Sequence, residues 1–206
     1  MIVVFGANGK LGREICIHLS DHALTAAVRR PVTDDIFTRH NIPTVCADVL
    51  ALAQCEQLIA TLQPEIVIST VGGKNSQGIR SDDIGNINII KAVEKYAPTA
   101  KMVLVTSLGC GDQWLMMSPM FQRALGEAIQ AKTTAEHYLQ NSALDWLIVR
   151  PSGLTDGEDE AIQLLTHLPE KHSVYVSRKS VARGIGMLLA QGKTKGIYSI
   201  LSATNA

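Results

Sequence analysis

The heptapeptide Gly6-Ala7-Asn8-Gly9-Lys10-Leu11-Gly12 directly follows the apolar run Ile2–Phe5. A short, continuous apolar run that ends at a glycine is typical of a buried strand. After the run, apolar residues recur every fourth position, which predicts a helix over Lys10–Ser20. The three glycines therefore lie in the turn between a strand and a helix, where glycine-rich turns bind phosphate groups.

Each glycine of this turn has a separate physical role. One permits the sharp change from strand to helix, one lets backbone amides approach a pyrophosphate, and one lets the helix pack on the strand. The first turn of the helix then presents N–H groups and positive potential to the phosphates. The G-x-x-G-x-x-G spacing predicts a dinucleotide site. Its expected contacts are Gly6, Asn8, Gly9, Lys10, Leu11 and Gly12.

Short apolar runs alternate with segments of helical period along the rest of the chain. Strands separated by helices are joined by crossovers, which build a mostly parallel sheet. We therefore predict an α/β fold of the Rossmann type, a doubly wound and mostly parallel sheet in a single domain of residues 1–206. A short C-terminal segment, residues 151–206, is expected on the substrate side. The further strands are expected at Ala23–Val28, Pro43–Cys46, Glu65–Thr70, Lys101–Ser107, Asp145–Arg150, Ser173–Ser177 and Ile197–Leu201, and the further helices at Thr33–Arg39, Ala51–Leu62, Asp82–Ala97, Gln122–Asn141 and Val181–Gln191.

One segment has no clear period, and a second is a short acidic run. Gly109–Phe121 follows an expected strand, at the sheet edge where doubly wound folds bind ligands. Its large apolar side chains suit a flat aromatic ligand, and they equally suit a buried core or a dimer contact. They are Trp114, Met116, Met117, Met120 and Phe121. The second segment, the acidic run Gly157–Glu160, is interpreted as the solvated start of a helix.

The composition excludes several classes of protein. Of the 206 residues, 46% are hydrophobic and 18% are charged, with zero net charge, so the basic surface of a nucleic-acid-binding protein is not expected. No apolar stretch has the length that spans a bilayer. The four cysteines lack metal-ligand spacing, which predicts free thiols, no metal site and a cytoplasmic location. The oligomeric state is left open between monomer and homodimer.

The end of the second expected strand bears on the choice of cofactor. It carries Arg29-Arg30, whereas proteins that prefer NAD usually place an acid there to bind the ribose hydroxyls. Arginine accommodates a 2′-phosphate, so we expect NADP(H), although a solvated basic pair would look the same. Asp48 follows the third strand, where it would either bind the adenine or form a turn.

Together these motifs resemble the short-chain dehydrogenase/reductase superfamily, over nearly the whole chain. The set is most similar to its atypical members, the NmrA-like proteins and the biliverdin reductase B or flavin reductase type. The motifs are Gly6–Gly12, Arg29-Arg30, Ala47-Asp48-Val49, Val71-Gly72-Gly73, Asp82-x-x-Gly85-x-x-Asn88, Thr106-Ser107 and Arg150–Leu154. The resemblance implies further cofactor contacts by Val49, Val71, Gly72, Gly73, Thr106, Ser107, Lys132, Pro151 and Ser152.

The resemblance is incomplete at the expected catalytic centre. Catalytic members use a serine, a tyrosine and a lysine, the last two spaced Y-x-x-x-K. The serine and lysine correspond to Ser107 and Lys132, while Ala128 stands in the tyrosine position. If these two residues do not contact ligand, Lys132 is an exposed helix residue and Ser107 a strand-end cap. Tyr138 is expected to face away from Lys132, because six residues separate them on a helix.

The missing tyrosine directs the functional hypothesis. Reduction of a flavin, quinone or tetrapyrrole needs above all the placement of a hydride, and water can supply the proton to a delocalised acceptor. We therefore expect an NADPH-dependent reductase of a flat conjugated acceptor, with Ser107 and Lys132 as catalytic residues. The alternative is a non-catalytic NADP(H) sensor of the NmrA-like type. A sugar-nucleotide epimerase is disfavoured, because too few residues follow Pro151 for a separate substrate domain.

Overall fold

The central sheet has the strand order β3-β2-β1-β4-β5-β6-β10-β8 in a computed structural model that describes residues 1–203. All neighbouring strands pair in parallel except β8, which runs antiparallel to β10. The order reverses between β1 and β4, so the predicted doubly wound, Rossmann-type fold is confirmed. The strands are β1 (Ile2–Phe5), β2 (Leu24–Val28), β3 (Thr44–Cys46), β4 (Ile66–Ser69), β5 (Lys101–Val105), β6 (Asp145–Pro151), β8 (Ile162–Leu165) and β10 (Gly196–Ser202).

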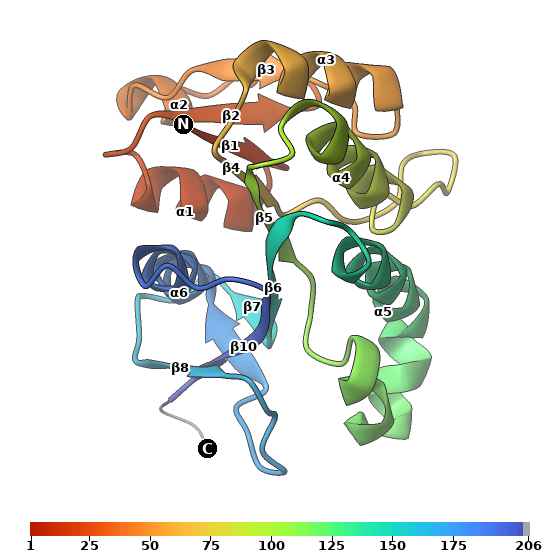
Figure 1. Cartoon of the computed structure of the whole chain (residues 1–206). Coiled ribbons are helices and arrows are strands. Elements are labelled where there is room, and N and C mark those ends of the chain that lie inside the picture. The colour runs from red at the N-terminus through yellow and green to blue at the C-terminus, as the bar shows by residue number, and fades with distance from the viewer. Residues whose placement is uncertain (204–206) are drawn as a thin grey trace.

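Two layers of helices cover the sheet (Figure 1). Alternate residues of β1 face opposite layers, as a strand buried on both sides requires: Val4 lies in the core below one layer, and Val3 and Phe5 lie below the other. The first layer contains α1 (Lys10–His18) and α6 (Arg178–Ala190), with the short α2 (Ile36–Arg39) beside them. The second contains α3 (Leu52–Leu62), α4 (Ile84–Tyr96) and α5 (Pro119–Gln140).

Two helices begin three residues earlier than the apolar period alone predicts. Ser118 caps α5 by accepting a hydrogen bond from the Phe121 amide at 3.2 Å, and Pro119 occupies the first helical position. Proline is favoured there because its missing N–H has no partner within the helix. Ser177 caps α6 in the same way, through the Ser180 amide at 3.1 Å. The capping residues extend both helices beyond their apolar stripes.

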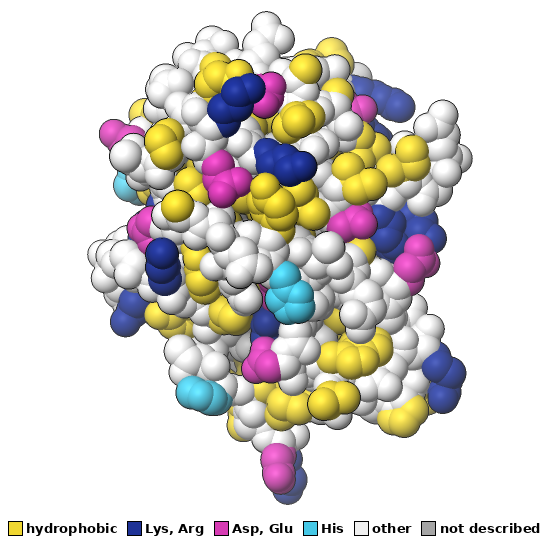
Figure 2. Space-filling model, turned by 45° about the vertical axis from the view of Figure 1, so that its right-hand side comes forward, with side chains coloured by type: hydrophobic (Ala, Val, Ile, Leu, Met, Phe, Trp, Pro, Cys, Tyr) yellow, Lys and Arg dark blue, Asp and Glu magenta, His cyan; other side chains and the backbone are white. Residues whose placement is uncertain are grey.

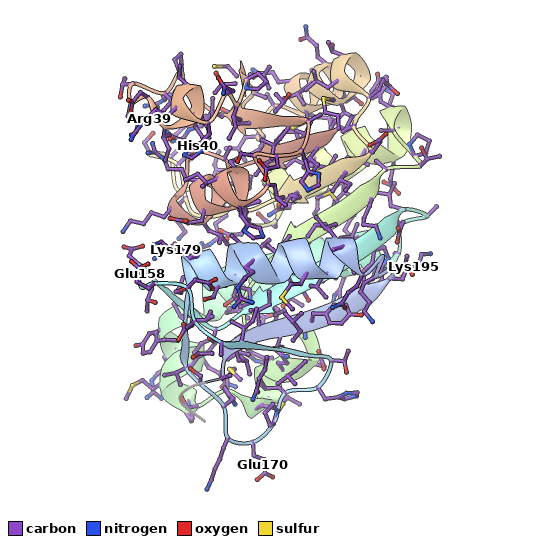
Figure 3. All side chains as sticks on the ribbon, turned by 90° about the vertical axis from the view of Figure 1, so that its left-hand side faces the viewer. Arg39, His40, Glu158, Glu170, Lys179 and Lys195 are labelled. Carbon is purple, nitrogen blue, oxygen red and sulfur yellow. The ribbon has the colours of Figure 1, made fainter. Side chains whose placement is uncertain are left out.

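The interpretation of Gly157–Glu160 as the start of a helix is wrong. The run connects two strands that the sequence did not predict, β7 (Gly153–Thr155) and β8, and β7 pairs with β9 (Tyr175–Ser177). Its acidic side chains neutralise cations of α6: Glu158 lies 2.7 Å from Lys179, and Asp159 lies 2.8 Å from Arg183. Figure 3 shows Glu158 beside Lys179 at the beginning of α6.

The irregular segment after β5 is held by buried polar contacts. It forms a short 3-10 helix, η1 (Gly111–Met116). Gln113 accepts a hydrogen bond from the Gly109 amide at 3.1 Å and donates one to Ser199 at 2.8 Å. The Gly111 amide donates to the Thr133 hydroxyl at 3.0 Å. These contacts fasten the segment to α5 on one side and to β10 on the other.

The apolar side chains of this segment divide into two groups. Met117 is buried with Leu108 and Leu201, and Phe121 packs against them. Leu115, Met116 and Met120 are exposed, at 89%, 50% and 74%. The core interpretation therefore holds for the first group only. Figure 2 shows hydrophobic side chains at the surface on this side of the molecule.

Candidate functional site

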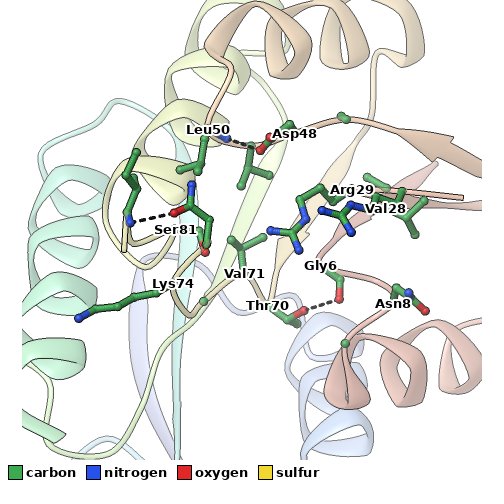
Figure 4. Close-up of a pocket in the computed structure, with 18 residues that line it drawn as sticks. Gly6, Asn8, Val28, Arg29, Asp48, Leu50, Thr70, Val71, Lys74 and Ser81 are labelled. Carbon is green, nitrogen blue, oxygen red and sulfur yellow. Dashed lines mark hydrogen bonds between the residues drawn. The ribbon is translucent and has the colours of Figure 1, made fainter. Parts of the chain in front are cut away.

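A cleft of about 400 Å³ lies at the carboxyl ends of β1, β2, β3 and β4, where the strand order reverses. Figure 4 shows how these strand ends surround it. This is the position at which doubly wound sheets bind their ligands. Among the residues predicted from sequence, the cleft is lined by Gly6, Asn8, Gly9, Arg29, Arg30, Asp48, Val49, Val71 and Gly72.

The glycine turn forms one wall of the cleft, and its geometry excludes side chains. Gly6 has φ +73°, and a Cβ there would lie 2.8 Å from the Thr70 hydroxyl oxygen. A Cβ on Gly12 would lie only 2.3 Å from the carbonyl oxygen of Gly6, so α1 packs directly on the turn. Gly9 stands at the N-cap of α1 and has no side chain with which to cap it. The backbone of the turn therefore fits a phosphate-binding cradle.

The other side chains of the turn point in different directions. Leu11 is buried in the core between α1 and α6. The Lys10 ammonium lies outside the cleft lining and pairs with Asp156 at 2.6 Å. Hydrogen bonding to Lys10, together with Arg178, holds the pKa of Asp156 below its usual range. In this conformation Lys10 links the glycine turn to the segment that follows β7.

Two exposed arginines stand at the end of β2, and Arg29 extends toward the space between Gly6 and Asp48 (Figure 4). Arg13 of α1, which the sequence did not indicate as a site residue, supports the glycine turn from outside the cleft lining. It donates hydrogen bonds to Asn8 and pairs with Asp34 at 2.7 Å, and the hydrogen bond from Arg13 lowers the pKa of Asp34. Its position one residue after the last glycine of the turn was the available signal.

Asp48 forms a turn and also borders the cleft. Its carboxylate accepts a hydrogen bond from the Leu50 amide at 3.0 Å, as a side chain that stabilises a turn does. The next residue, Val49, packs against Gly85 of α4, and its carbonyl accepts a hydrogen bond from Asn88 at 2.9 Å. The polar side chain of Asp48 and the apolar side chain of Val49 together form the wall of the cleft opposite the glycine turn.

The turn after β4 rests on a buried carboxylate, Asp82, that was not predicted as a site residue. Asp82 is 2% exposed and accepts a hydrogen bond from the Gly73 amide at 2.9 Å. It pairs with Lys132 of α5 at 2.9 Å and with Arg80 at 3.1 Å. Burial raises the pKa of Asp82, but Lys132, the Gly73 amide and Arg80 together outweigh burial, so this pKa is lowered.

The ends of β5 and β6 place the remaining predicted residues farther along the sheet. Thr106 is buried, and its hydroxyl donates to Glu136 at 2.6 Å rather than toward the cleft. Ser107 is half-buried, and its carbonyl accepts a hydrogen bond from Cys110. The carbonyl of buried Pro151 accepts a bond from Leu108. The Ser152 hydroxyl oxygen is buried without a hydrogen-bond partner in the described structure.

No tyrosine of α5 compensates for the alanine at position 128. Ala128 and Lys132 lie one turn apart on α5. Tyr138 donates a hydrogen bond to Glu94 of α4 at 3.3 Å, so it faces away from Lys132 as predicted. Among residues 1–203, no group of histidine, cysteine or acidic side chains is arranged to hold a metal ion, and no helix is long and apolar enough to cross a membrane.

Comparison with known proteins adds independent information. A family model described as NAD(P)H-binding matches residues 6–191. The solved structure of ChuY from Escherichia coli O157:H7, named as an anaerobilin reductase, is 29% identical with a TM-score of 0.84, and the match covers 100% of this chain and 98% of ChuY. The UPF0659 protein C216.03 of Schizosaccharomyces pombe is 26% identical over 100% of this chain and 90% of its own length.

A more distant structure extends the likeness in fold. A short-chain dehydrogenase/reductase from Veillonella parvula, solved in complex with NADP, is 17% identical with a TM-score of 0.81, over 99% of this chain and 95% of its own. The family model includes the glycine turn, the cleft and both layers of helices. The fold is that of NAD(P)H-binding oxidoreductases, and the chain belongs to the NAD(P)H-binding family.

Proposed function

We propose that the protein is an NADPH-dependent reductase of a flat conjugated acceptor of the flavin, quinone or tetrapyrrole type. The observation that carries the cofactor preference is the pair Arg29-Arg30 at the cleft end of β2. Proteins that prefer NAD usually place a carboxylate there to bind the ribose hydroxyls, whereas two guanidinium groups suit a 2′-phosphate.

The residues of the cleft fit such a cofactor. When bound, the nicotinamide supplies a hydride, that is, two electrons and one proton. The backbone of the turn from Gly6 to Gly12 would hold the pyrophosphate, and the wall at Asp48 and Val49 would border the adenine. The nicotinamide half would lie on the other side of the reversal in strand order, over the ends of β4, β5 and β6. The residues that would border it are Val71, Gly72, Gly73, Ser107 and Lys132, with Thr106, Pro151 and Ser152 at the floor.

The proposed class of acceptor rests on Ala128, which lies one helical turn from Lys132. A simple carbonyl needs an acid to protonate the developing alkoxide, and Ala128 provides none. A conjugated acceptor spreads the charge and takes its proton from water, so placement suffices. The exposed Leu115, Met116 and Met120 add an adaptable apolar surface next to this end of the sheet. The reductase name of ChuY supports the same class of reaction.

A second function has one specific observation in its favour. A protein that only binds the cofactor needs no catalytic tyrosine, so Ala128 at that position is also compatible with binding alone. Such a protein would be a sensor of the NADP(H) redox state in the atypical, NmrA-like branch. The free state of all four cysteines supports a reducing, cytoplasmic location for either function.

Calorimetry with NADPH and NADH tests the cofactor preference. We expect NADPH to bind at least about tenfold more tightly, because a charge-assisted phosphate contact contributes about 1.5–3 kcal/mol. The double variant R29A/R30A should lose this preference while keeping its affinity for NADH. R39A is the matched control, since Arg39 lies on α2 and pairs with Asp35 outside the cleft. Equal affinities in the wild type would contradict the NADPH assignment.

Oxidation of NADPH in the presence of flavins, quinones and linear tetrapyrroles tests the reaction. We expect acceptor-dependent loss of the absorbance of the reduced nicotinamide. Tight binding of NADPH without oxidation by any acceptor of the panel would favour the sensor over the reductase.

A further inference from the structure

Asp82, which is buried, and Lys132, which is partly buried, form an ion pair directly beneath the turn that follows β4. Their side chains are 2% and 17% exposed and lie 2.9 Å apart. A Cβ on Gly72 would lie 2.8 Å from the Asp82 carboxylate and 3.0 Å from the Lys132 ammonium. Gly72 lines the cleft, so both charges lie directly beside a residue of the cleft wall, at the edge of the ligand space.

The position of this pair along the sheet identifies the part of the ligand it would meet. Arg29 and Arg30 stand at the end of β2, on one side of the reversal in strand order. Gly72 follows β4, on the other side. A dinucleotide crosses this reversal, with its two halves on opposite sides. With the 2′-phosphate at β2, the nicotinamide half passes over β4 and therefore over the pair.

Among the neighbouring acidic side chains, Asp82 rather than Glu127 is the partner of Lys132. Arg80 also contacts Asp82, but its Nε lies 3.1 Å from Glu127, which pairs with Lys74 as well at 2.7 Å. These contacts hold the pKa of Glu127 at about 2, through Arg80 first and then Lys74. Glu127 is therefore committed to two other cations, and Asp82 compensates the charge of Lys132.

The charge of a nicotinamide depends on its redox state, because the oxidised ring is a cation and the reduced ring is neutral. We propose that Asp82 is a positioning residue that holds Lys132 under Gly72 and cancels its charge, and thereby sets how strongly the site discriminates NADPH from NADP⁺. This inference rests on the proposed function, in which a nicotinamide lies at this end of the cleft. Without Asp82, the ammonium repels the oxidised ring, and without Lys132, the carboxylate attracts it.

The two single variants therefore shift the affinity ratio in opposite directions. D82N keeps an oxygen for the Gly73 amide and should increase the preference for NADPH over NADP⁺ about fivefold, as one uncompensated charge at the edge of a site does. K132M should shift the ratio toward NADP⁺, and by less, because Arg80 still contacts Asp82. The double variant D82N/K132M should return close to the wild-type ratio. A purely structural role for the pair gives no such reversal of sign.

Calorimetry with NADPH and with NADP⁺, in the absence of any acceptor, measures these ratios. D83N is the matched control, since Asp83 caps α4 through the Ile84 amide and asparagine caps equally well. Two results overturn the inference. In the first, the NADPH to NADP⁺ affinity ratios of D82N and K132M equal those of the wild type and D83N. In the second, the ratios of both variants move in the same direction. If D82N does not fold, the direction of the K132M shift decides alone. A wild-type protein that binds neither dinucleotide overturns the proposed function instead.

Discussion

Glu136 and Arg150 form a two-point ion pair between α5 and β6, with carboxylate–guanidinium distances of 2.7 and 3.0 Å. Glu136 is 0% exposed and Arg150 is 2% exposed. Thr106 donates a further hydrogen bond to Glu136, and Arg150 reaches the exposed Asp112 at 2.6 Å. One buried pair thus joins the ends of β5 and β6 to the helix that carries Lys132.

Removal of the Glu136 charge should destabilise the protein strongly. We expect E136Q to lower the free energy of unfolding by about 3–5 kcal/mol, because Arg150 is left buried without its main counter-charge. Urea denaturation at neutral pH measures the change. D112N removes the exposed partner of the same arginine and should cost at most about 1 kcal/mol. If E136Q and D112N lost the same unfolding free energy, the buried position of Glu136 and the exposed position of Asp112 would not explain their roles.

Alanine substitutions in the glycine turn should separate folding from binding. In G12A the new Cβ meets the Gly6 carbonyl oxygen at 2.3 Å, so we expect a loss of about 1–3 kcal/mol in stability. In G9A the new Cβ would lie 3.2 Å from the Gly6 carbonyl oxygen, a close approach that a small shift relieves, and Gly9 lines the cleft that would hold the phosphates. G9A should therefore unfold near the wild-type temperature and bind NADPH at least about tenfold more weakly. Thermal melting and calorimetry on both variants check this contrast, which a stable G12A protein would refute.

The four cysteines should differ sharply in reactivity. Burial raises the pKa of the Cys16 and Cys55 thiols to about 12 and that of Cys110 to about 11, whereas Cys46 is exposed. Because the thiolate is the reactive form, a disulfide reagent at about pH 8 should label one thiol quickly in the native protein and all four in denaturant. C46S should remove the fast phase. A second fast thiol in that variant would show that one of the three buried sites opens readily.

The contribution of Asp82 to stability should disappear in acid. Its pKa is lowered by its cationic and amide partners, so the ionised form is favoured by folding. The difference in unfolding free energy between wild type and D82N should stay constant above about pH 5 and shrink as the pH falls below about 4. Urea denaturation across this range tests the effect, and a difference that persists undiminished at about pH 3 would contradict it.

The sequence predicted the fold because local signals and the global pattern agreed. Three signals can be recognised from residues that are neighbours in the sequence, and the structure contains the corresponding features. They are the glycine turn, the alternation of apolar runs and helical periods, and the arginines at the end of β2. β8 was missed because its antiparallel pairing with β10 joins residues from 34 (Leu165 and Ser199) to 40 (Ile162 and Ser202) positions apart, and no local period indicates it. The acidic run before it has the composition of a helix start, and only the cations of α6 explain its charge.

The part of the site that escaped prediction is made of contacts between distant segments. Asp82 belongs to a motif that the sequence analysis recognised, yet its role depends on Lys132, fifty residues later. Thr106 was expected at the cofactor, but its hydroxyl is directed to Glu136. Residue types at strand ends indicate where a ligand binds, whereas the direction of each side chain is decided by partners that only the fold brings together.

The fastening of η1 has a consequence for how an acceptor would be selected. Gln113 bridges Gly109 and Ser199, and Thr133 holds Gly111, so hydrogen bonds to β10 and α5 hold the backbone of this segment. A ligand that docks against an ordered wall loses little freedom in the protein, and its affinity then depends on how well its outline matches a surface that does not adapt. The exposed methionines at the rim can change rotamer, but the backbone beneath them is fixed. Acceptors of different ring size should thus be distinguished at the rigid base, while variation in their peripheral groups is accommodated at the rim.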